Sequence, residues 1–366
     1  MDFAQDRVTT LHDLSGATPS APVDESVVVV PIAAESTAAA TPDHVFEALA
    51  RVDPAGVVVP FRGPRSVAAA LREWVNGYDL SVMVLWCNAP AVERTLATHD
   101  LDGRPGKGRD VWLGLGVAGD RAEYVAVHDA DATSYDETVV PRLLAPLETH
   151  EFVKGYYARV EDGRLYGRLA RLFVAPLLRA LDDRHDAAVV DYLSAFRYPL
   201  AGEFALTGRM ARQFRACRNW GLEIGTLGEA FARVGARRSA QVDLGVYRHD
   251  HKPVSGHDGL LAMSDRVGEA LLRTVEEAGV DVDYRRTKAA YREAADRLID
   301  QYAADAAFNG LSYDPTAERE QADQYASSVR PPETETGPES DDRLPAWVDV
   351  DLSPATVVEA ARPAGD

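Results

Sequence analysis

Two aspartates, Asp129 and Asp131, stand where an apolar segment ends. The stretch AEYVAVHDADATSYDE (122–137) begins as a buried strand would and then presents carboxylates at alternate positions. Carboxylates at i and i+2 after a strand can both turn towards one hard cation such as Mg²⁺ or Mn²⁺. Such a cation would neutralise the charge that develops on a diphosphate leaving group. The pattern predicts a metal and diphosphate site, and a solvated loop is the alternative.

A lysine flanked by glycines precedes this stretch. Residues 104–110 read RPGKGRD, and Lys107 is one of four lysines in the chain. The glycines let the backbone approach an anion closely, while the ammonium group supplies positive charge. The GxxxxGK[ST] pattern of a P-loop is absent. We therefore expect Lys107 to contact an anion, and an ordinary turn is the alternative.

Histidines follow a second strand-like segment. In GVYRHDHKP (245–253), His249 and His251 lie two residues apart. Either could supply an imidazole ligand to the same cation, because neutral imidazole is a common metal ligand. A hydrogen-bonded surface histidine is the alternative. Ligation is favoured because the two aspartates need further ligands.

Two further segments carry groups that suit an acidic, hydroxylated ligand. In YPLAGEFALTGR (198–209), Gly202, Thr207 and Arg209 could hold an anionic acceptor. In NWGLEIGTL (219–227), Glu223 could hydrogen-bond a polyol. By composition alone these segments are a loop and the start of a helix.

The motif DADAT also fits a different class of enzyme. Haloacid-dehalogenase-like phosphohydrolases open with DxDxT, in which the first aspartate, here Asp129, is a nucleophile. That chemistry requires a downstream lysine and an acidic pair at a strand end. Asp182 and Asp183 end a helical pattern instead, and the motif follows several strands. The phosphohydrolase is therefore the weaker alternative.

Strands and helices alternate around these motifs. The segments GVVVPF (56–61), PRSVAAALREWV (64–75), LSVMVLW (80–86) and APAVERTLATH (89–99) read as strand, helix, strand and helix. This alternation predicts an α/β fold with a mostly parallel sheet flanked by helices. Ligands of such sheets bind beyond the carboxyl ends of the strands, which is where Asp129 and Asp131 fall.

The chain divides into four regions. We expect residues 1–55 to be an N-terminal extension with one strand, SVVVVPI (26–32), and residues 56–262 to form the sheet domain. Residues 263–330 have helical periodicity. Residues 331–366 are acidic and rich in proline, so we expect a largely disordered tail.

Charge and composition exclude several classes. The net charge of −19 and the lack of a basic patch disfavour nucleic acid and anionic membranes as partners. The polar N-terminus and the absence of a run of 18 apolar residues predict a cytoplasmic protein without a secretory signal. The acidic surplus and the scarcity of lysine are typical of a halophile. Two cysteines, Cys87 and Cys217, are too few for a disulfide framework.

Taken in order, the segments resemble one family. VVVPF, RPGKG, HDADATSY, KGYYARV, RLARLFVAPLL, YPLAGEFALTGR, WGLEIGTL and QVDLGVYRH are similar to segments of the glucosyl-3-phosphoglycerate synthases, which are retaining glycosyltransferases of the GT-A fold. VVVPF and DADATSY are also similar to mannosylglycerate synthases. The likeness covers roughly residues 56–275 and excludes the first 50 residues and the tail.

The resemblance implies a role for each motif. Asp129 and Asp131 would bind Mg²⁺ or Mn²⁺ and the sugar nucleotide, with His249 as the third protein ligand. Pro60, Lys107 and Ala130 would also contact the nucleotide-sugar, and Gly202, Thr207 and Arg209 would face the acceptor's carboxylate or phosphate. Asp131 and Glu223 would be the catalytic pair, with Glu223 on the transferred sugar.

The implied reaction is a metal-dependent hexose transfer with retention of configuration. The donor would be of the UDP-glucose or GDP-mannose type and the acceptor 3-phosphoglycerate or glycerate, in a protein that resembles homodimers. The family's PALNEE-like segment is here PFRGPRS (60–66), without the usual Asn and Glu. A non-catalytic relative with the same fold is therefore a further alternative, and the donor base stays open.

Overall fold

A central sheet organises the protein. The computed structural model describes residues 5, 7–33, 41–246, 248, 257–332 and 343–362. Within these ranges nine strands form one sheet in the order β1-β11-β7-β10-β6-β2-β4-β3, with β5 paired to β4. The strands are β1 (Thr9–Leu11), β2 (Ser26–Val29), β3 (Ile32–Ala33), β4 (Gly56–Arg62), β5 (Val82–Trp86), β6 (Tyr124–Val127), β7 (Phe152–Ala158), β10 (Phe204–Thr207) and β11 (Ser239–Val246).

The sheet is mostly parallel, as predicted. Strand β10 is the exception, because it runs antiparallel to both of its neighbours, β6 and β7. A separate short hairpin joins β8 (Val160–Glu161) and β9 (Arg164–Leu165). The reversal of β10 decides which of its residues reach the carboxyl edge of the parallel strands.

Strand β2 lies at the centre of the sheet and not in an extension. It pairs in parallel with β4 on one side and β6 on the other, and all four of its residues are buried. A continuous run of valines is typical of a strand that is covered on both faces. The structure therefore differs from the expected boundary at residue 56, since β2 and the helix α1 (Thr41–Val52) precede it.

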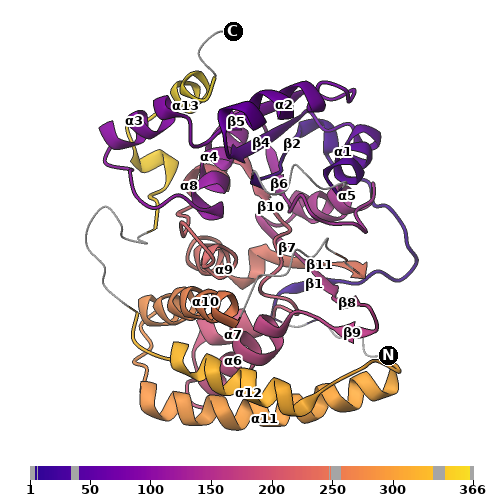
Figure 1. Cartoon of the computed structure of the whole chain (residues 1–366), viewed down its shortest axis with the longest axis vertical. Coiled ribbons are helices and arrows are strands. Elements are labelled where there is room, and N and C mark those ends of the chain that lie inside the picture. The colour runs from indigo at the N-terminus through magenta and orange to yellow at the C-terminus, as the bar shows by residue number, and fades with distance from the viewer. Residues whose placement is uncertain are drawn as a thin grey trace.

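Helices cover the sheet in two groups (Figure 1). The helices α1, α2 (Arg65–Val75), α3 (Pro90–Thr98), α4 (Lys107–Gly119), α5 (Val139–Leu144) and α8 (Gly208–Gln213) lie in the upper half of the view. The helices α6 (Ala175–Asp182), α7 (Ala188–Ser194), α9 (Leu222–Arg233), α10 (His257–Glu277), α11 (Tyr284–Phe308) and α12 (Pro315–Tyr325) lie in the lower half. In the described part of the chain, no helix has the length and apolar character needed to cross a bilayer.

Helix α4, in the upper group, is almost entirely buried. Residues 108–119 are all buried, and the helix packs on β2 and β4. A Cβ atom at Gly114 would lie 2.7 Å from the ring of Pro60 and 2.8 Å from Val29, so glycine permits this close packing. The tight fit fixes the position of Lys107, which begins the helix.

The C-terminal segment packs on α4, which differs from the expected disordered tail. Trp347 stacks on Trp112 with ring centroids 4.3 Å apart, and its indole N–H donates to the Trp112 carbonyl. The helix α13 (Pro354–Ala360) then contacts α3 and α4. The sequence around Trp347 has too few apolar residues to form a core of its own, but Leu344 and Trp347 complete an existing one.

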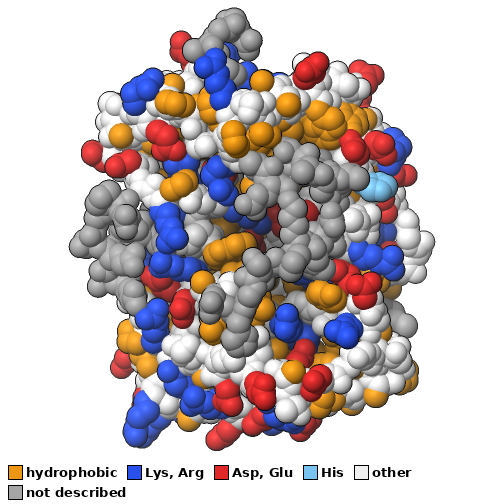
Figure 2. Space-filling view, in the orientation of Figure 1, with side chains coloured by type: hydrophobic (Ala, Val, Ile, Leu, Met, Phe, Trp, Pro, Cys, Tyr) orange, Lys and Arg blue, Asp and Glu red, His pale blue; other side chains and the backbone are white. Residues whose placement is uncertain are grey.

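Acidic and basic side chains are interspersed over the face shown in Figure 2. The exposed large apolar side chains are scattered along the chain, at Leu14, Trp220, Val246, Phe308 and Val348 among others. Single exposed apolar residues of this kind are normal for a water-exposed surface.

Candidate active site

The two aspartates lie at the point where the strand order reverses. From β2 the next strands along the chain, β4 and β5, extend the sheet in one direction, whereas β6 adds on the other side. Val29 of β2 pairs with Val127 of β6, so both strands end at the same edge, and Asp129 and Asp131 follow immediately. Ligands of open α/β sheets bind at this crevice. The predicted position of the acidic pair agrees with this geometry.

Lys107 joins residues from three elements. Its Nζ lies 2.6 Å from Oδ1 of Asp129, after β6, and 3.0 Å from Oε1 of Glu223, in the first turn of α9. The Lys107 side chain is 28% exposed. Burial alone would lower the pKa of Lys107, but the two carboxylates outweigh it and raise the pKa above its ordinary value. The lysine is therefore held charged between two acids that are 94 residues apart in sequence.

The glycines around Lys107 serve packing. Lys107 begins α4, so the segment RPGKG is a helix start rather than an isolated turn. A Cβ atom at Gly108 would collide with the carbonyl of Cys217, and one at Gly106 would collide with the carbonyl of Arg218. The glycines thus let α4 begin directly against the segment that leads to Glu223.

Asp131 is held in a partly buried, negatively charged setting. Burial and the neighbouring Asp129 carboxylate raise the pKa of Asp131 from 3.8 to about 6, against the opposing effect of Lys107. Ala130 between the two aspartates is 6% exposed, so its side chain packs inward while the carboxylates flank it. Two carboxylates that repel each other in this way gain from a shared cation.

A second lysine, which no sequence motif marks as a site residue, lies beneath the site. Lys154 of β7 is fully buried, and among the described residues its Nζ has no hydrogen-bond partner. Burial lowers the pKa of Lys154 to about 8, against the carboxylates of Glu223 and Glu203. Its Nζ lies 5.6 Å from the ring centroid of Phe204. The scarcity of lysine that singled out Lys107 also marks Lys154.

Of the three predicted acceptor residues, the structure brings only Gly202 to the site. A Cβ atom there would collide with the Asp129 carboxylate, so Gly202 lies directly against it. Strand β10 then runs away from this edge, with Phe204 opposite Val127 and Thr207 opposite Tyr124. At about 3.4 Å per residue, Thr207 is about 17 Å from Gly202.

Thr207 and Arg209 therefore lie at the opposite edge of the sheet, away from the acidic pair, whereas the sequence had suggested that they lie beside it. The Thr207 hydroxyl caps α8 by accepting a hydrogen bond from the Met210 N–H. Arg209 forms an ion pair with Glu151. The sequence does not reveal the reversed direction of β10, and these two positions depend on it.

Pro60 does not face the acidic pair. It is buried in β4 opposite Leu85, with its ring against Gly114 of α4. The strand that borders β6 is β2. The carboxyl end of β2, and not that of β4, is therefore next to the acidic pair. The side chain of Pro60 therefore packs in the core, against α4.

The predicted metal ligand His249 lies outside the described residues. Its neighbour Arg248 is described, and its carbonyl accepts a hydrogen bond of 2.7 Å from the Thr133 N–H. The Arg248 N–H in turn donates to the Ser134 hydroxyl at 2.8 Å. The chain at residue 248 is thus fastened to the loop that carries Asp129 and Asp131. Within the described ranges, no three His, Cys, Asp or Glu side chains form a metal-binding group.

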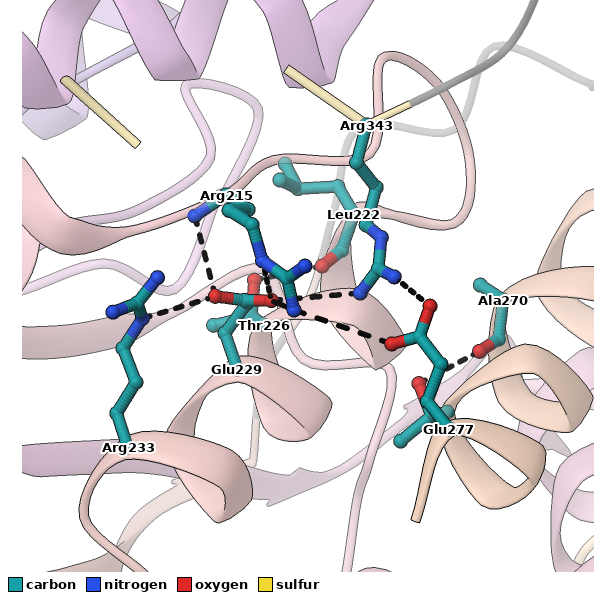
Figure 3. A network of polar contacts seen from close by, with 9 residues as sticks. Arg215, Leu222, Thr226, Glu229, Arg233, Ala270, Glu277 and Arg343 are labelled. Atoms are coloured by element: carbon teal, nitrogen blue, oxygen red, sulfur yellow. Dashed lines mark hydrogen bonds and ion pairs between the residues drawn. The ribbon is translucent and has the colours of Figure 1, made fainter. Parts of the chain in front are cut away.

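A buried network fixes the helix that carries Glu223 (Figure 3). Glu229, two turns further along α9, is 1% exposed in its side chain and binds Arg215 at 2.6 Å, Arg233 at 3.1 Å and Arg343 at 3.4 Å. Arg343 also pairs with Glu277 of α10. The C-terminal segment that begins at Arg343 therefore ties α9 to α10, while Trp347 holds α4. Both helices that bring residues to Asp129 are braced by this segment.

Among the residues that the structure describes, the strand-end acidic pair required for a phosphohydrolase is not found around Asp129. Asp183, at the end of α6, pairs with Arg297 of α11 at 3.6 Å. The lysine on Asp129 comes from upstream, in α4, and it also binds Glu223. Asp183 therefore lies at a helix end beside an arginine, and not in the strand-end acidic pair that the alternative needs.

The fold and the site define a glycosyltransferase of the GT-A class. A solved structure of glucosyl-3-phosphoglycerate synthase from Mycobacterium tuberculosis, in complex with Mn²⁺, UDP and phosphoglyceric acid, matches this fold with a TM-score of 0.55. It is 26% identical and the match covers 75% of this chain and 88% of that chain.

Two relatives from other organisms are more similar in sequence. The glucosyl-3-phosphoglycerate synthase of Methanococcoides burtonii is 34% identical over 282 residues, which cover 70% of this chain and 68% of the relative. That of Persephonella marina is 34% identical over 299 residues, covering 76% and 74%. No family model matches the chain. The chain belongs to the glucosyl-3-phosphoglycerate synthase family.

Proposed function

We propose that this protein transfers glucose from a nucleoside-diphosphate donor to 3-phosphoglycerate, with retention of configuration and with Mg²⁺ or Mn²⁺ as cofactor. One observation carries the proposal: Lys107 gathers Asp129 and Glu223 at the sheet's switch point. Support also comes from the Mycobacterium tuberculosis relative, whose structures contain Mn²⁺ or Mg²⁺ with UDP, and phosphoglyceric acid.

The chemistry of the loop suits a divalent metal ion. Asp129 and Asp131 offer hard oxygen ligands. His249, which follows the hydrogen-bonded Arg248, would be the third protein ligand of the metal ion. A bound Mg²⁺ or Mn²⁺ would supply a positive charge that stabilises the departing diphosphate. Asp131, with its pKa near 6, is ionised at neutral pH and ready to bind a cation.

The other site residues position the donor. Lys107 can exchange its contact with Asp129 for the donor diphosphate, because an ammonium group is a compact charge on a flexible stem. Glu223 accepts a hydrogen bond from Lys107 and would accept another from a hydroxyl of the transferred sugar. The ammonium group of Lys154 would attract the carboxyl groups of Glu223 and Glu203 from beneath the site.

Acceptor recognition falls to residues near Gly202 rather than Thr207 or Arg209. The Asp129 carboxylate contacts Gly202, so an acceptor beside the sugar would meet the backbone there. Glycerate as acceptor and a GDP-linked mannose as donor are the related alternatives. The excess of acidic over basic residues supports activity at high salt concentration, and a measurement of activity against KCl concentration would test this.

A matched pair of variants tests the proposal. The wild-type protein is incubated with UDP- or GDP-hexoses, 3-phosphoglycerate or glycerate, and Mn²⁺ or EDTA, and products are identified by mass spectrometry. Asp131→Ala should abolish transfer. Asp136→Ala should retain it, because that exposed carboxylate in the same loop bonds only to Thr138 among the described residues. No transfer by wild type with any pair, or phosphate release from simple phosphoesters, would refute the proposal.

A further inference from the structure

A positively charged cavity lies beside Lys107. Its volume is about 460 Å³, and it opens between the start of α4, the loop before α9 and the helix α10. The described residues in its wall include five cationic side chains and two carboxylates: Arg62, Arg104, Lys107, Arg266, Arg330, Asp265 and Glu269. Figure 2 shows Lys and Arg side chains at the level of α9 and α10 on this face. In a chain of net charge −19, such a cavity suits an anionic small molecule.

Two of the arginines are neutralised within the cavity wall. Arg266 pairs with Glu269 at 3.3 Å, and Arg330 lies 3.9 Å from Asp265. Arg62 differs, because its partner is Asp110 of α4, whose side chain is 4% exposed and lies behind the wall. Lys107 is likewise paired with Asp129 and Glu223 outside this wall, whereas Arg104 has no ion pair among the described residues.

Asp110 fixes the orientation of Arg62. The Arg62 Nε donates to Oδ2 of Asp110 at 2.8 Å. Burial raises the pKa of Asp110 to about 6, against the effect of Arg62, so Asp110 is ionised at neutral pH. The Arg62 side chain is 35% exposed. Because Nε is engaged, the two terminal nitrogens are the part of the guanidinium that a ligand can use.

The strand order places Arg62 at a distance from the acidic pair. Asp129 follows β6, and Arg62 ends β4, with β2 between these strands. Two strand spacings of about 4.8 Å separate the two strand ends by about 10 Å. If the diphosphate of a donor lies at Asp129 and Lys107, the ribose extends along this gap. The part of the nucleotide that reaches Arg62 is then the base.

We propose that Arg62 binds the base of the donor nucleotide and favours guanine over uracil. This inference rests on the proposed function, because the diphosphate must lie at Asp129. Guanine presents O6 and N7 as adjacent acceptors, which a guanidinium fork binds in a bidentate manner, whereas uracil has no such pair. The orienting bond to Asp110 makes the fork rigid, so the discrimination requires arginine and not merely a positive charge.

Titration calorimetry of the full chain with Mn²⁺ and either GDP or UDP tests the inference. Wild type should bind GDP more tightly than UDP by about tenfold or more, the range expected for one bidentate pair. Arg62→Lys keeps a charge beside Asp110 but removes the fork, so the preference for GDP should disappear while UDP affinity changes little. Arg62→Ala should do the same, and its thermal unfolding is followed because it leaves Asp110 buried without this partner.

Arg104→Ala is the matched control. It removes one charge from the same cavity, and among the described residues no hydrogen bond or ion pair of Arg104 is found. It should weaken GDP and UDP equally and preserve their ratio. Equal affinities of wild type for GDP and UDP, or an equal loss of both in Arg62→Lys, would overturn base reading by Arg62. Failure of wild type to bind either nucleotide would instead overturn the proposed function.

Discussion

Replacing Asp131 by asparagine should stabilise the protein when no divalent cation is present. Burial and Asp129 raise the pKa of Asp131 from 3.8 to about 6, so ionisation of this side chain opposes folding at neutral pH. A shift of about two units, at about 1.4 kcal/mol each, sets a ceiling of about 3 kcal/mol. Solvent screening of a partly exposed carboxylate reduces this, so we expect a gain of about 1–3 kcal/mol in Asp131→Asn.

The sign of the pH dependence follows from the raised pKa. A carboxyl group whose pKa is higher in the folded state stabilises that state fully below 3.8, and this contribution is lost as the pH rises through about 6. Wild type and Asp131→Asn should therefore differ most at pH 8 and converge as the pH falls towards 4. The free energy of unfolding is measured by urea denaturation in EDTA at pH 5 and pH 8.

Asp129→Asn is the control variant, and added Mn²⁺ should reverse the order of stability of wild type and Asp131→Asn. Asp129 pairs with Lys107 at 2.6 Å, so its loss leaves Lys107 with Glu223 alone and should lower stability. Added Mn²⁺ should stabilise wild type by mass action and leave Asp131→Asn unchanged. An Asp131→Asn variant that is no more stable than wild type at pH 8 in EDTA, or whose advantage is as large at pH 5, would contradict the raised pKa of Asp131.

Three further predictions concern other parts of the site. Lys154→Met should raise the free energy of unfolding at pH 7, because the lowered pKa of about 8 makes the charged lysine destabilising at that pH. This gain in stability should vanish above about pH 10.5, where the lysine is neutral in both the folded and the unfolded state. Turnover of the variant should fall by about tenfold or more. Equal turnover in this variant would exclude a functional role for the buried ammonium group. Lys107→Met should weaken donor binding by about 10- to 100-fold in calorimetry, the loss expected for a hydrogen bond to a charged group, and unchanged affinity would contradict its contact with the diphosphate. Trp347→Ala should lower the free energy of unfolding by about 3–5 kcal/mol in urea because the ring is buried on Trp112, and a smaller loss than about 1 kcal/mol would show that the C-terminal segment does not brace α4.

The sequence was sufficient to predict the sheet and its acidic pair. Apolar runs of strand length alternate with amphipathic helices, and Asp129 and Asp131 directly follow such a run. The carboxyl edge of a parallel sheet is fixed by chain direction alone, so the location of these two aspartates can be predicted without knowing how the helices pack. The central position of β2 is harder to predict, because the sequence of an early strand is the same whether the strand lies at the centre of the sheet or outside the domain.

Strand direction decides which predicted residues lie near the acidic pair. Gly202 and Thr207 lie five residues apart along the chain. Because β10 runs antiparallel to β6, Gly202 lies near Asp129 and Thr207 lies at the other edge of the sheet. The position of Pro60 away from the acidic pair has a related cause, because strand order decides which loop borders β6. The packed C-terminal segment was missed because Trp347 and Leu344 stabilise a core built by α4 and not one of their own.

The balance of charge at the site gives a reason for the two lysines. Asp129, Asp131, Glu203 and Glu223 interact electrostatically with Lys107 and Lys154. The two ammonium groups offset part of the mutual repulsion of these carboxylates, and a bound divalent cation would offset more of it. Arginine, which prevails elsewhere in the chain, would fix its carboxylate partners in a bidentate fork. Lysine holds the acids with a single point charge, so Asp129 can still be released to a metal ion.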